Sequence, residues 1–118
     1  MGDADKDEIF DRAAFLERLD GDFELLDELV ETFRAECPRL LSETRTAVSL
    51  GDGRSLERAA HALKGSVSNF CAPAAFEAAR RLEQMGREGD LTRAGDALVA
   101  LEVEVDRFQA ALATASAG

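Results

Sequence analysis

The strongest periodic pattern in this sequence runs from Phe23 to Leu50 and reads FELLDELVETFRAECPRLLSETRTAVSL. Its apolar residues recur every three or four positions, which is the spacing of one face of an α-helix. Pro38 lies inside the pattern. Because proline removes a backbone donor and crowds the preceding turn, we expect a kink there, with a break into two helices as the alternative. The residues on the apolar face are Leu26, Leu29, Val30, Phe33, Cys37, Leu40, Leu41, Thr44 and Val48.

A short helix is predicted before this long one. Asp11 can cap it with its carboxylate, and Phe10 and Phe15 can form a hydrophobic staple around the cap. The helix should end near Leu19, because the sequence DGD at 20–22 is a stop followed by a fresh N-cap.

Three more helical patterns follow the long helix. They run over about residues 54–70, from Pro73 to the sequence GREGD at 86–90, and from a cap at Asp90 to about residue 112. The residues expected to face inward are Leu56, Ala60, Leu63, Val67, Phe70, Ala75, Ala79, Leu82, Met85, Ala94, Leu98, Leu101, Val105, Phe108 and Leu112.

These patterns predict an all-α fold, since no segment of any length alternates apolar and polar residues. Four amphipathic helices joined by short connections pack most simply as an antiparallel up-down-up-down four-helix bundle, with the short additional N-terminal helix at one end. We expect one domain over residues 9–113, a flexible N-terminus at 1–8 and a flexible tail at 114–118. The core should be mostly aliphatic, without a cofactor pocket.

The composition excludes several classes of function. Fourteen Lys and Arg against 24 Asp and Glu give a formal charge of −10, which repels nucleic acids and anionic lipid surfaces. No apolar run approaches the roughly 20 residues of a membrane span, and the acidic start MGDADKDEIF does not resemble a signal peptide. Two cysteines suit a reducing compartment, so we expect a cytoplasmic protein, with a piece cut from a membrane-bound parent as the alternative. We also expect a monomer.

The only histidine in the chain, His61, lies in the helical stretch AAHALKGSVSNFC at 59–71. It is a core residue, a metal ligand or a chemically active group. On a helical wheel it lies about 140° from Leu56, which marks the apolar stripe, so the ring should face largely outward. This direction disfavours the core role and leaves an ordinary solvated histidine as an alternative. A metal site is also disfavoured, since Cys37 lies on a core stripe and Cys71 is alone.

Two neighbours of His61 share its side of the helix. Lys64, one turn on, would stabilise an anion attached to the ring, with an ordinary surface lysine as the alternative. Gly65 costs roughly 1 kcal/mol relative to alanine inside a helix. Its expected use is clearance for a reacting group of another protein, with a merely tolerated glycine as the alternative. Serine catalysis is disfavoured, because Ser66 and Ser68 on a regular helix leave no spare backbone donors for an oxyanion hole.

The sequence AHALKGSVSNFCA at 60–72 resembles the His-x-Leu-Lys-Gly-Ser signature of histidine phosphotransfer (HPt) domains, the phosphorelay modules that carry phosphate between receiver domains. The similarity extends over about residues 9–112 and includes a proline in the long helix. Cys71 and Ala72 stand where the family commonly has Gly-Ala, which should alter the helix end or turn and leave the chemistry unchanged. The resemblance implies a phosphotransfer function for this chain.

It implies, more closely, that His61 accepts a phosphoryl group on Nε2 from a receiver phospho-aspartate and passes it to another receiver aspartate. In the family a polar residue 22 positions after the histidine orients the ring, and here that residue is Glu83, with a plain helix-surface glutamate as the alternative. Lys64 would neutralise charge on the phosphoryl oxygens. The sequence has no ATP-binding motif, so the chain should be a phosphocarrier without kinase activity of its own. We expect no cofactor or metal of its own, and magnesium on the receiver partner.

The expected docking surface is the exposed face around His61, with Gly65, Ser68, Arg54 and Glu57. Receiver (response-regulator) domains are the expected partners, with a hybrid histidine kinase as a further candidate. Two other functions stay open. The first is a helical-bundle adaptor that binds receivers without phosphoryl transfer, and the second is a domain that also speeds the loss of phosphate from a receiver.

Overall fold

A computed structural model describes residues 9–117 of the chain, with side chains as far as Thr114. The predicted flexible N-terminus at 1–8 therefore lies outside the described residues. The chain forms α2 (Arg12–Arg18), α3 (Phe23–Leu50), α4 (Gly53–Ser68), α5 (Pro73–Glu88) and α6 (Ala94–Ala117).

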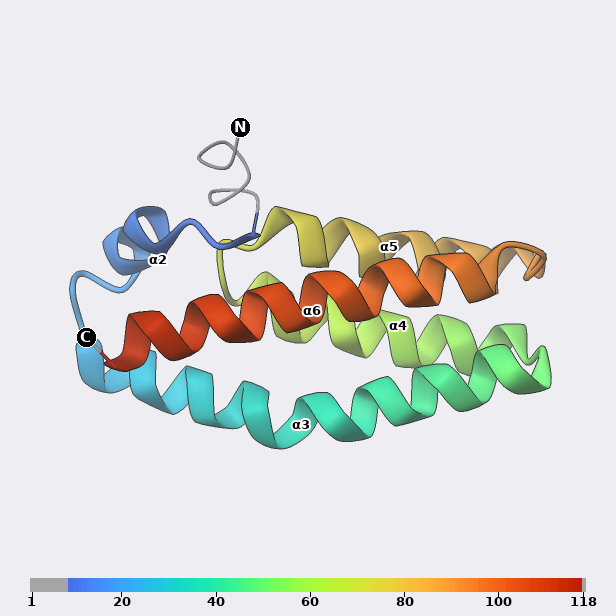
Figure 1. Cartoon of the computed structure of the whole chain (residues 1–118), viewed down its shortest axis with the longest axis horizontal. Helices are drawn as coiled ribbons and strands as arrows, with labels where there is room; N and C mark the ends of the chain where they lie inside the picture. The colour runs from blue at the N-terminus through green and yellow to red at the C-terminus, as the bar shows by residue number, and fades with distance from the viewer. Residues whose placement is uncertain (1–8, 118) are drawn as a thin grey trace.

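The four long helices lie side by side along the long axis of the molecule, and α2 lies at the end where α3 begins and α6 ends (Figure 1). Successive long helices run in opposite directions. The packed pairs are α3 with α4, α4 with α5, α5 with α6, and α3 with α6, which closes the ring of four. The predicted all-α fold, a four-helix bundle with a short N-terminal helix, is confirmed.

The long helix α3 has the predicted limits. The Asp22 carboxylate caps it by accepting a hydrogen bond from the Leu25 backbone N–H at 3.0 Å. Pro38 lies inside one continuous helix, so the alternative of two helices is wrong. The ribbon of α3 bends near its middle (Figure 1), and the exposed position of Pro38 directs the ring away from the core.

The predicted cap at Asp90 is wrong. Its carboxylate accepts hydrogen bonds from Thr92, at 3.2 Å from the backbone N–H and 2.7 Å from the hydroxyl. An aspartate bonded two residues ahead forms a local turn instead of a cap, and α6 begins later, at Ala94. The helix continues to Ala117, and the flexibility of the tail stays a prediction.

The core lies between the four long helices and is mostly aliphatic, as predicted. Leu98 and Met85, which were expected inside, are half-buried against it. At the α2 end five phenylalanine rings pack together, with centroids 5.0 to 6.5 Å apart. These rings are Phe10, Phe15, Phe33, Phe70 and Phe108.

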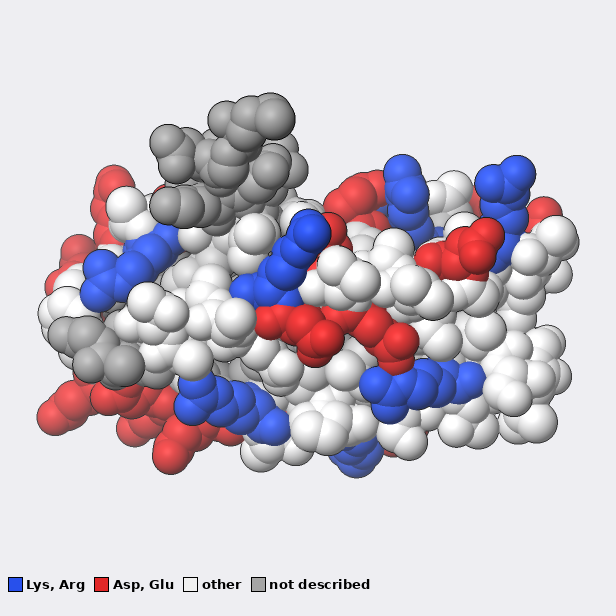
Figure 2. Space-filling view, viewed as in Figure 1, with Lys and Arg blue, Asp and Glu red and all other residues white. Residues whose placement is uncertain are grey.

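Surface charge is uneven on the face that α3 and α6 present. Acidic side chains gather where α3 begins, and basic side chains are interspersed with acidic ones further along (Figure 2). The exposed acidic residues of the first turns of α3 are Glu24, Asp27, Glu28 and Glu31. Over residues 9–117, no helix combines the length and the apolar character that crossing a membrane requires.

Candidate functional site

His61 lies on the outer side of α4. The core stripe of this helix, Leu56, Ala60, Leu63 and Val67, is fully buried, and it fixes which side of α4 meets solvent. The His61 side chain is 67% exposed, the outward direction that the helical wheel predicts. The imidazole is therefore open to a partner along one edge.

Glu83 on α5 binds the other edge of the ring. Glu83 Oε2 lies 2.7 Å from His61 Nδ1, and the Glu83 side chain is only 5% exposed. An ionised carboxylate can only accept a hydrogen bond, so this contact assigns the proton to Nδ1. The lone pair of the neutral ring then lies on Nε2, which faces outward.

Lys64 binds the second oxygen of the same carboxylate. Its Nζ lies 2.6 Å from Glu83 Oε1 and 5.9 Å from the centroid of the Phe76 ring, and its side chain is 24% exposed. The structure thus brings the predicted residues together, with His61 and Lys64 both bound to the Glu83 carboxylate. The predicted contact of Lys64 with phosphoryl oxygens stays a prediction.

Arg87 is a member of the site that the sequence analysis missed. Its Nη2 donates to Glu83 Oε2 at 3.0 Å, and its Nε donates to Glu57 Oε2 at 2.9 Å. The four-residue spacing of Glu83 and Arg87 on one helix was a usable signal for the first contact. Glu57, predicted in the docking surface, is tied to Arg87, so it links α4 to α5 beside the histidine.

Glu83 is ionised near neutral pH. Burial raises the pKa of its carboxyl, but hydrogen bonds from Lys64 and then His61 outweigh that effect and hold the pKa below the ordinary 4.5. The site therefore contains a fixed negative charge against Nδ1, held by two cationic side chains, Lys64 and Arg87.

The other residues predicted for docking lie along the exposed side of α4. Gly65 is exposed, and a Cβ added to it would meet no atom within 4 Å. Ser68 is exposed and its hydroxyl donates to the Gly65 carbonyl at 2.7 Å. Arg54 is exposed in the first turn of α4, two turns before His61. Their part in docking stays a prediction.

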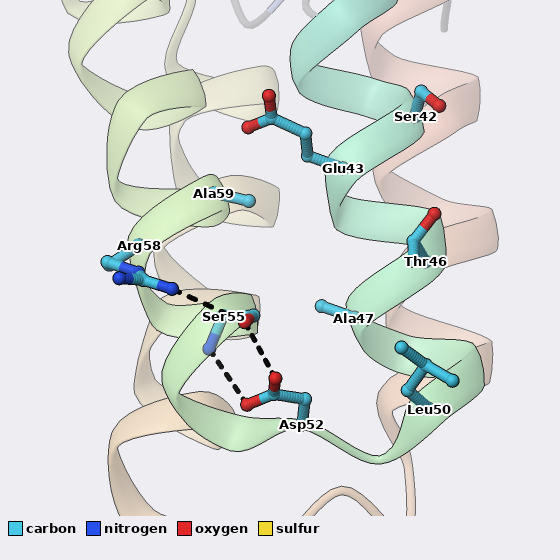
Figure 3. A pocket seen from close by; sticks show the side chains of 9 residues that line it. All are labelled: Ser42, Glu43, Thr46, Ala47, Leu50, Asp52, Ser55, Arg58 and Ala59. Atoms are coloured by element: carbon cyan, nitrogen blue, oxygen red, sulfur yellow. Dashed lines mark hydrogen bonds between the residues drawn. The ribbon is translucent and has the colours of Figure 1, made fainter.

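Surface hollows lie along α4, and two of them matter for the site. One, of about 500 Å³, lies between α3 and α4, and Asp52, Ser55 and Arg58 are joined by hydrogen bonds on its α4 side (Figure 3). His61, Lys64 and Arg87, which contact the Glu83 carboxylate, do not line this hollow. A second hollow, of about 380 Å³, adjoins the site and is lined by Lys64, Glu83 and Arg87, among others. Over the described part of the chain, no three His, Cys, Asp or Glu side chains gather as a metal site would need.

A family model described as the Hpt domain matches residues 28–111. The chain belongs to the Hpt domain family. A comparison with curated proteins found no match. Two solved structures resemble this Hpt domain along most of their length, and both are named for the same kind of module.

The first structure is the histidine-containing phosphotransfer protein B (HptB) of Pseudomonas aeruginosa PAO1. It is 25% identical to this Hpt domain, with a TM-score of 0.76 and 89% of each chain covered. The second is the HPT domain of an Hpt sensor hybrid histidine kinase from Shewanella. It is 14% identical, with a TM-score of 0.79 and coverage of 92% of this chain and 94% of that chain, and it bears on the fold alone.

As a member of this family, the protein has a phosphotransfer role in a phosphorelay with receiver domains, as a phosphocarrier and not a kinase. The unusual turn after the signature leaves the register of this Hpt domain intact, because His61 still meets Glu83 across it. Cys71 in that turn contacts α2 and its cap: its carbonyl accepts from the Asp11 N–H at 2.6 Å and its Sγ from Arg18 Nη1 at 3.7 Å.

Proposed function

We propose that His61 accepts a phosphoryl group on Nε2 from the phospho-aspartate of a receiver domain and passes it to an aspartate of another receiver. The observation that carries the proposal is the 2.7 Å contact of His61 Nδ1 with the buried Glu83 carboxylate on a ring that is otherwise exposed. In the neutral ring this contact places the proton on Nδ1 and leaves the lone pair on Nε2 of an exposed side chain, which is what an imidazole nucleophile requires.

In the proposed step, the Nε2 lone pair attacks phosphorus. The N–P bond forms while the P–O bond to the receiver carboxylate breaks, and the aspartate leaves as a carboxylate. The ring keeps its Nδ1 proton and becomes positively charged, next to the Glu83 carboxylate that offsets this charge. The second transfer reverses these bonds with a new aspartate, and no proton enters or leaves.

Lys64 has the proposed role of neutralising charge on the phosphoryl oxygens, which is a main contribution that a protein can make to phosphoryl transfer. Its Nζ contacts Glu83 Oε1 in the absence of a partner. The role therefore requires the flexible lysine chain to turn toward the phosphoryl group as the receiver docks.

Docking is proposed on the exposed side of α4, where the bare backbone at Gly65 admits a bulky group beside the ring and Ser68 and Arg54 flank it. We infer that the domain needs no cofactor of its own and that magnesium is supplied by the receiver. A hybrid histidine kinase is proposed as a further candidate partner, as the family resemblance of the sequence leads us to expect.

The test is incubation with a receiver domain carrying a radiolabelled phosphoryl group. The chain should take up label that is lost in acid and kept in alkali, as expected for a phosphorus–nitrogen bond. His61→Gln should take up none, and because the chain has a single histidine this one variant removes every candidate imidazole. Receiver binding without label would favour the adaptor function, and absence of label with several cognate receivers would contradict the proposal.

A further inference from the structure

We propose that Gly86 is a positioning residue, whose missing side chain lets α5 approach α4 closely enough for Glu83 to reach His61. The expected effect of Gly86 on phosphoryl transfer rests on the proposed function. Its effect on the His61–Glu83 contact concerns the free protein and does not depend on that function.

The backbones of α4 and α5 touch at Gly86. A Cβ built on Gly86 would lie 2.6 Å from both the Glu57 backbone N and the Gly53 carbonyl O, and 3.0 Å from the Glu57 Cα. A Cβ on Gly53 would lie 2.9 Å from the Gly86 carbonyl O. All these neighbours are backbone atoms, which cannot turn aside as a side chain would. Alanine at Gly86 therefore requires the two helices to move apart.

The Glu57–Gly86 contact lies one helical turn away from the His61–Glu83 contact along the same pair of helices. Glu57 lies one turn before His61 on α4, and Gly86 lies one turn after Glu83 on α5. Because the two helices are antiparallel, one step along both leads from the Glu57–Gly86 contact to the His61–Glu83 contact. Glu83 and Gly86 are both buried on the inner side of α5.

The displacement of α5 from α4 that alanine at Gly86 requires is large enough to break the His61–Glu83 hydrogen bond. Ordinary contact begins at 3.4 Å, so atoms placed 2.6 Å apart must separate by about 0.8 Å to reach it. The His61–Glu83 distance is 2.7 Å, and an extension of this size takes it beyond the roughly 3.2 Å limit of a good hydrogen bond. The ring then loses the acceptor that keeps the proton on Nδ1.

The primary experiment measures the tautomer of His61 in the free protein by ¹⁵N NMR of the ring nitrogens. Since His61 is the only histidine, its signals need no assignment among others. Gly86→Ala should lower the Nδ1–H population, and the rate of transfer from a phosphorylated receiver should fall roughly tenfold or more. An unchanged tautomer population in folded Gly86→Ala overturns the proposal.

Two control variants separate positioning from other effects. Gly95→Ala adds the same methyl group in α6, where a Cβ meets nothing within 4 Å. Val105→Ala lowers the stability of the bundle through the core of α6, where Val105 is fully buried. Both should keep the tautomer and the transfer rate per folded molecule. A change in the Val105→Ala tautomer would attribute the effect to stability and overturn the proposal.

A double-mutant cycle tests whether Gly86 acts through Glu83. In a Glu83→Ala background, Gly86→Ala should slow transfer no further, whereas an equal slowing in both backgrounds contradicts the proposal. If Gly86→Ala does not fold, Gly53→Ala enters the same gap from α4 with a softer 2.9 Å contact and should shift the tautomer in the same direction. If wild-type protein takes up no label while Gly86→Ala still shifts the tautomer, the proposed function is rejected and the role of the helix contact is kept.

Discussion

Lys64 Nζ lies 2.6 Å from Glu83 Oε1, so the lysine expected to meet the phosphoryl group is bound, in the free protein, to the carboxylate that holds the histidine. Glu83 Oε2 accepts hydrogen bonds from His61 Nδ1–H and from Arg87 Nη2. One buried carboxylate thus connects the nucleophile to both cations. Changes at Lys64 and at Glu83 should therefore differ in kind, and the two can be separated by experiment.

Glu83→Ala should slow phosphoryl transfer roughly tenfold or more, because the Nδ1 proton loses its acceptor and the charged ring of the intermediate loses its counter-charge. The fold should persist, since Arg87 and His61 are exposed and can be solvated. Glu83→Gln keeps an acceptor oxygen and should retain part of the rate. Transfer rates from a phosphorylated receiver measure the first effect, and circular dichroism measures the persistence of the fold. A transfer rate equal to wild type in Glu83→Ala would show that Glu83 has no role in the step.

Lys64→Ala should also slow transfer while keeping the helix content. If Lys64 acts on the phosphoryl oxygens, the slowing persists in a Glu83→Ala background, where the lysine has no carboxylate to hold. If it acts only by holding Glu83, that background removes the effect. Single-turnover rates of the two single variants and the double variant decide between these roles. Unchanged rates in the Lys64→Ala single variant would exclude both.

The sequence predicted the elements that depend on local patterns. The limits of α3 follow from Asp22 as a cap and from Gly51, which ends the helix with φ +66°. The outward direction of His61 follows from the wheel alone. The Asp90 cap failed because the Asp90 carboxylate accepts hydrogen bonds from Thr92, two residues on, in a local turn, and the helix begins only at Ala94.

Contacts between helices could not be predicted from these patterns. The Arg87–Glu57 pair and the Gly53–Gly86 contact join residues about thirty positions apart, and both depend on how far α5 slides along α4. The spacing of apolar residues in α4 and α5 does not determine how far one helix is shifted along the other. The pairing of His61 with Glu83 came from the family resemblance, because a wheel of α5 identifies a face but not its partner.

Gly65→Gln should block transfer by obstructing the receiver, with the fold intact. A Cβ at Gly65 meets nothing within 4 Å, and glutamine forms helices better than glycine by somewhat under 1 kcal/mol, so thermal stability should rise slightly. Gly95→Ala, also in an open position on a helix, is the matched control and should leave transfer unchanged. Unimpaired transfer by Gly65→Gln would remove the clearance role of this glycine.

Glu83 should make the stability of the fold depend on pH in acid. Its partners hold its pKa below the ordinary 4.5, and a lowered carboxyl pKa stabilises the folded state above the unfolded pKa and loses that effect as pH falls through the folded pKa. The stabilisation of wild type over Glu83→Gln should therefore shrink as the pH falls below about 5. Urea unfolding at each pH measures the difference, with a constant m-value as the check on two-state behaviour. A difference that persists unchanged in acid would contradict the prediction.

Arg54 should speed the encounter with an acidic partner. Residues 53–89, which hold α4 and α5, carry six basic and four acidic side chains, whereas the rest of the chain carries eight basic and twenty acidic ones. The histidine thus lies on the positive part of a negative protein, and such asymmetry orients charged partners before contact. Arg54→Glu should lower the association rate with a receiver several-fold at low salt, with a smaller effect as salt screens the charges.

The matched control for Arg54 is Arg107→Glu, which makes the same charge change on α6, where Arg107 contacts Glu104. Stopped-flow association rates over a series of salt concentrations should separate the two variants at low ionic strength and bring them together at high ionic strength. Equal losses in both would mean that only the net charge of −10 matters. A salt-independent loss in Arg54→Glu would instead indicate a direct contact with the receiver at the interface.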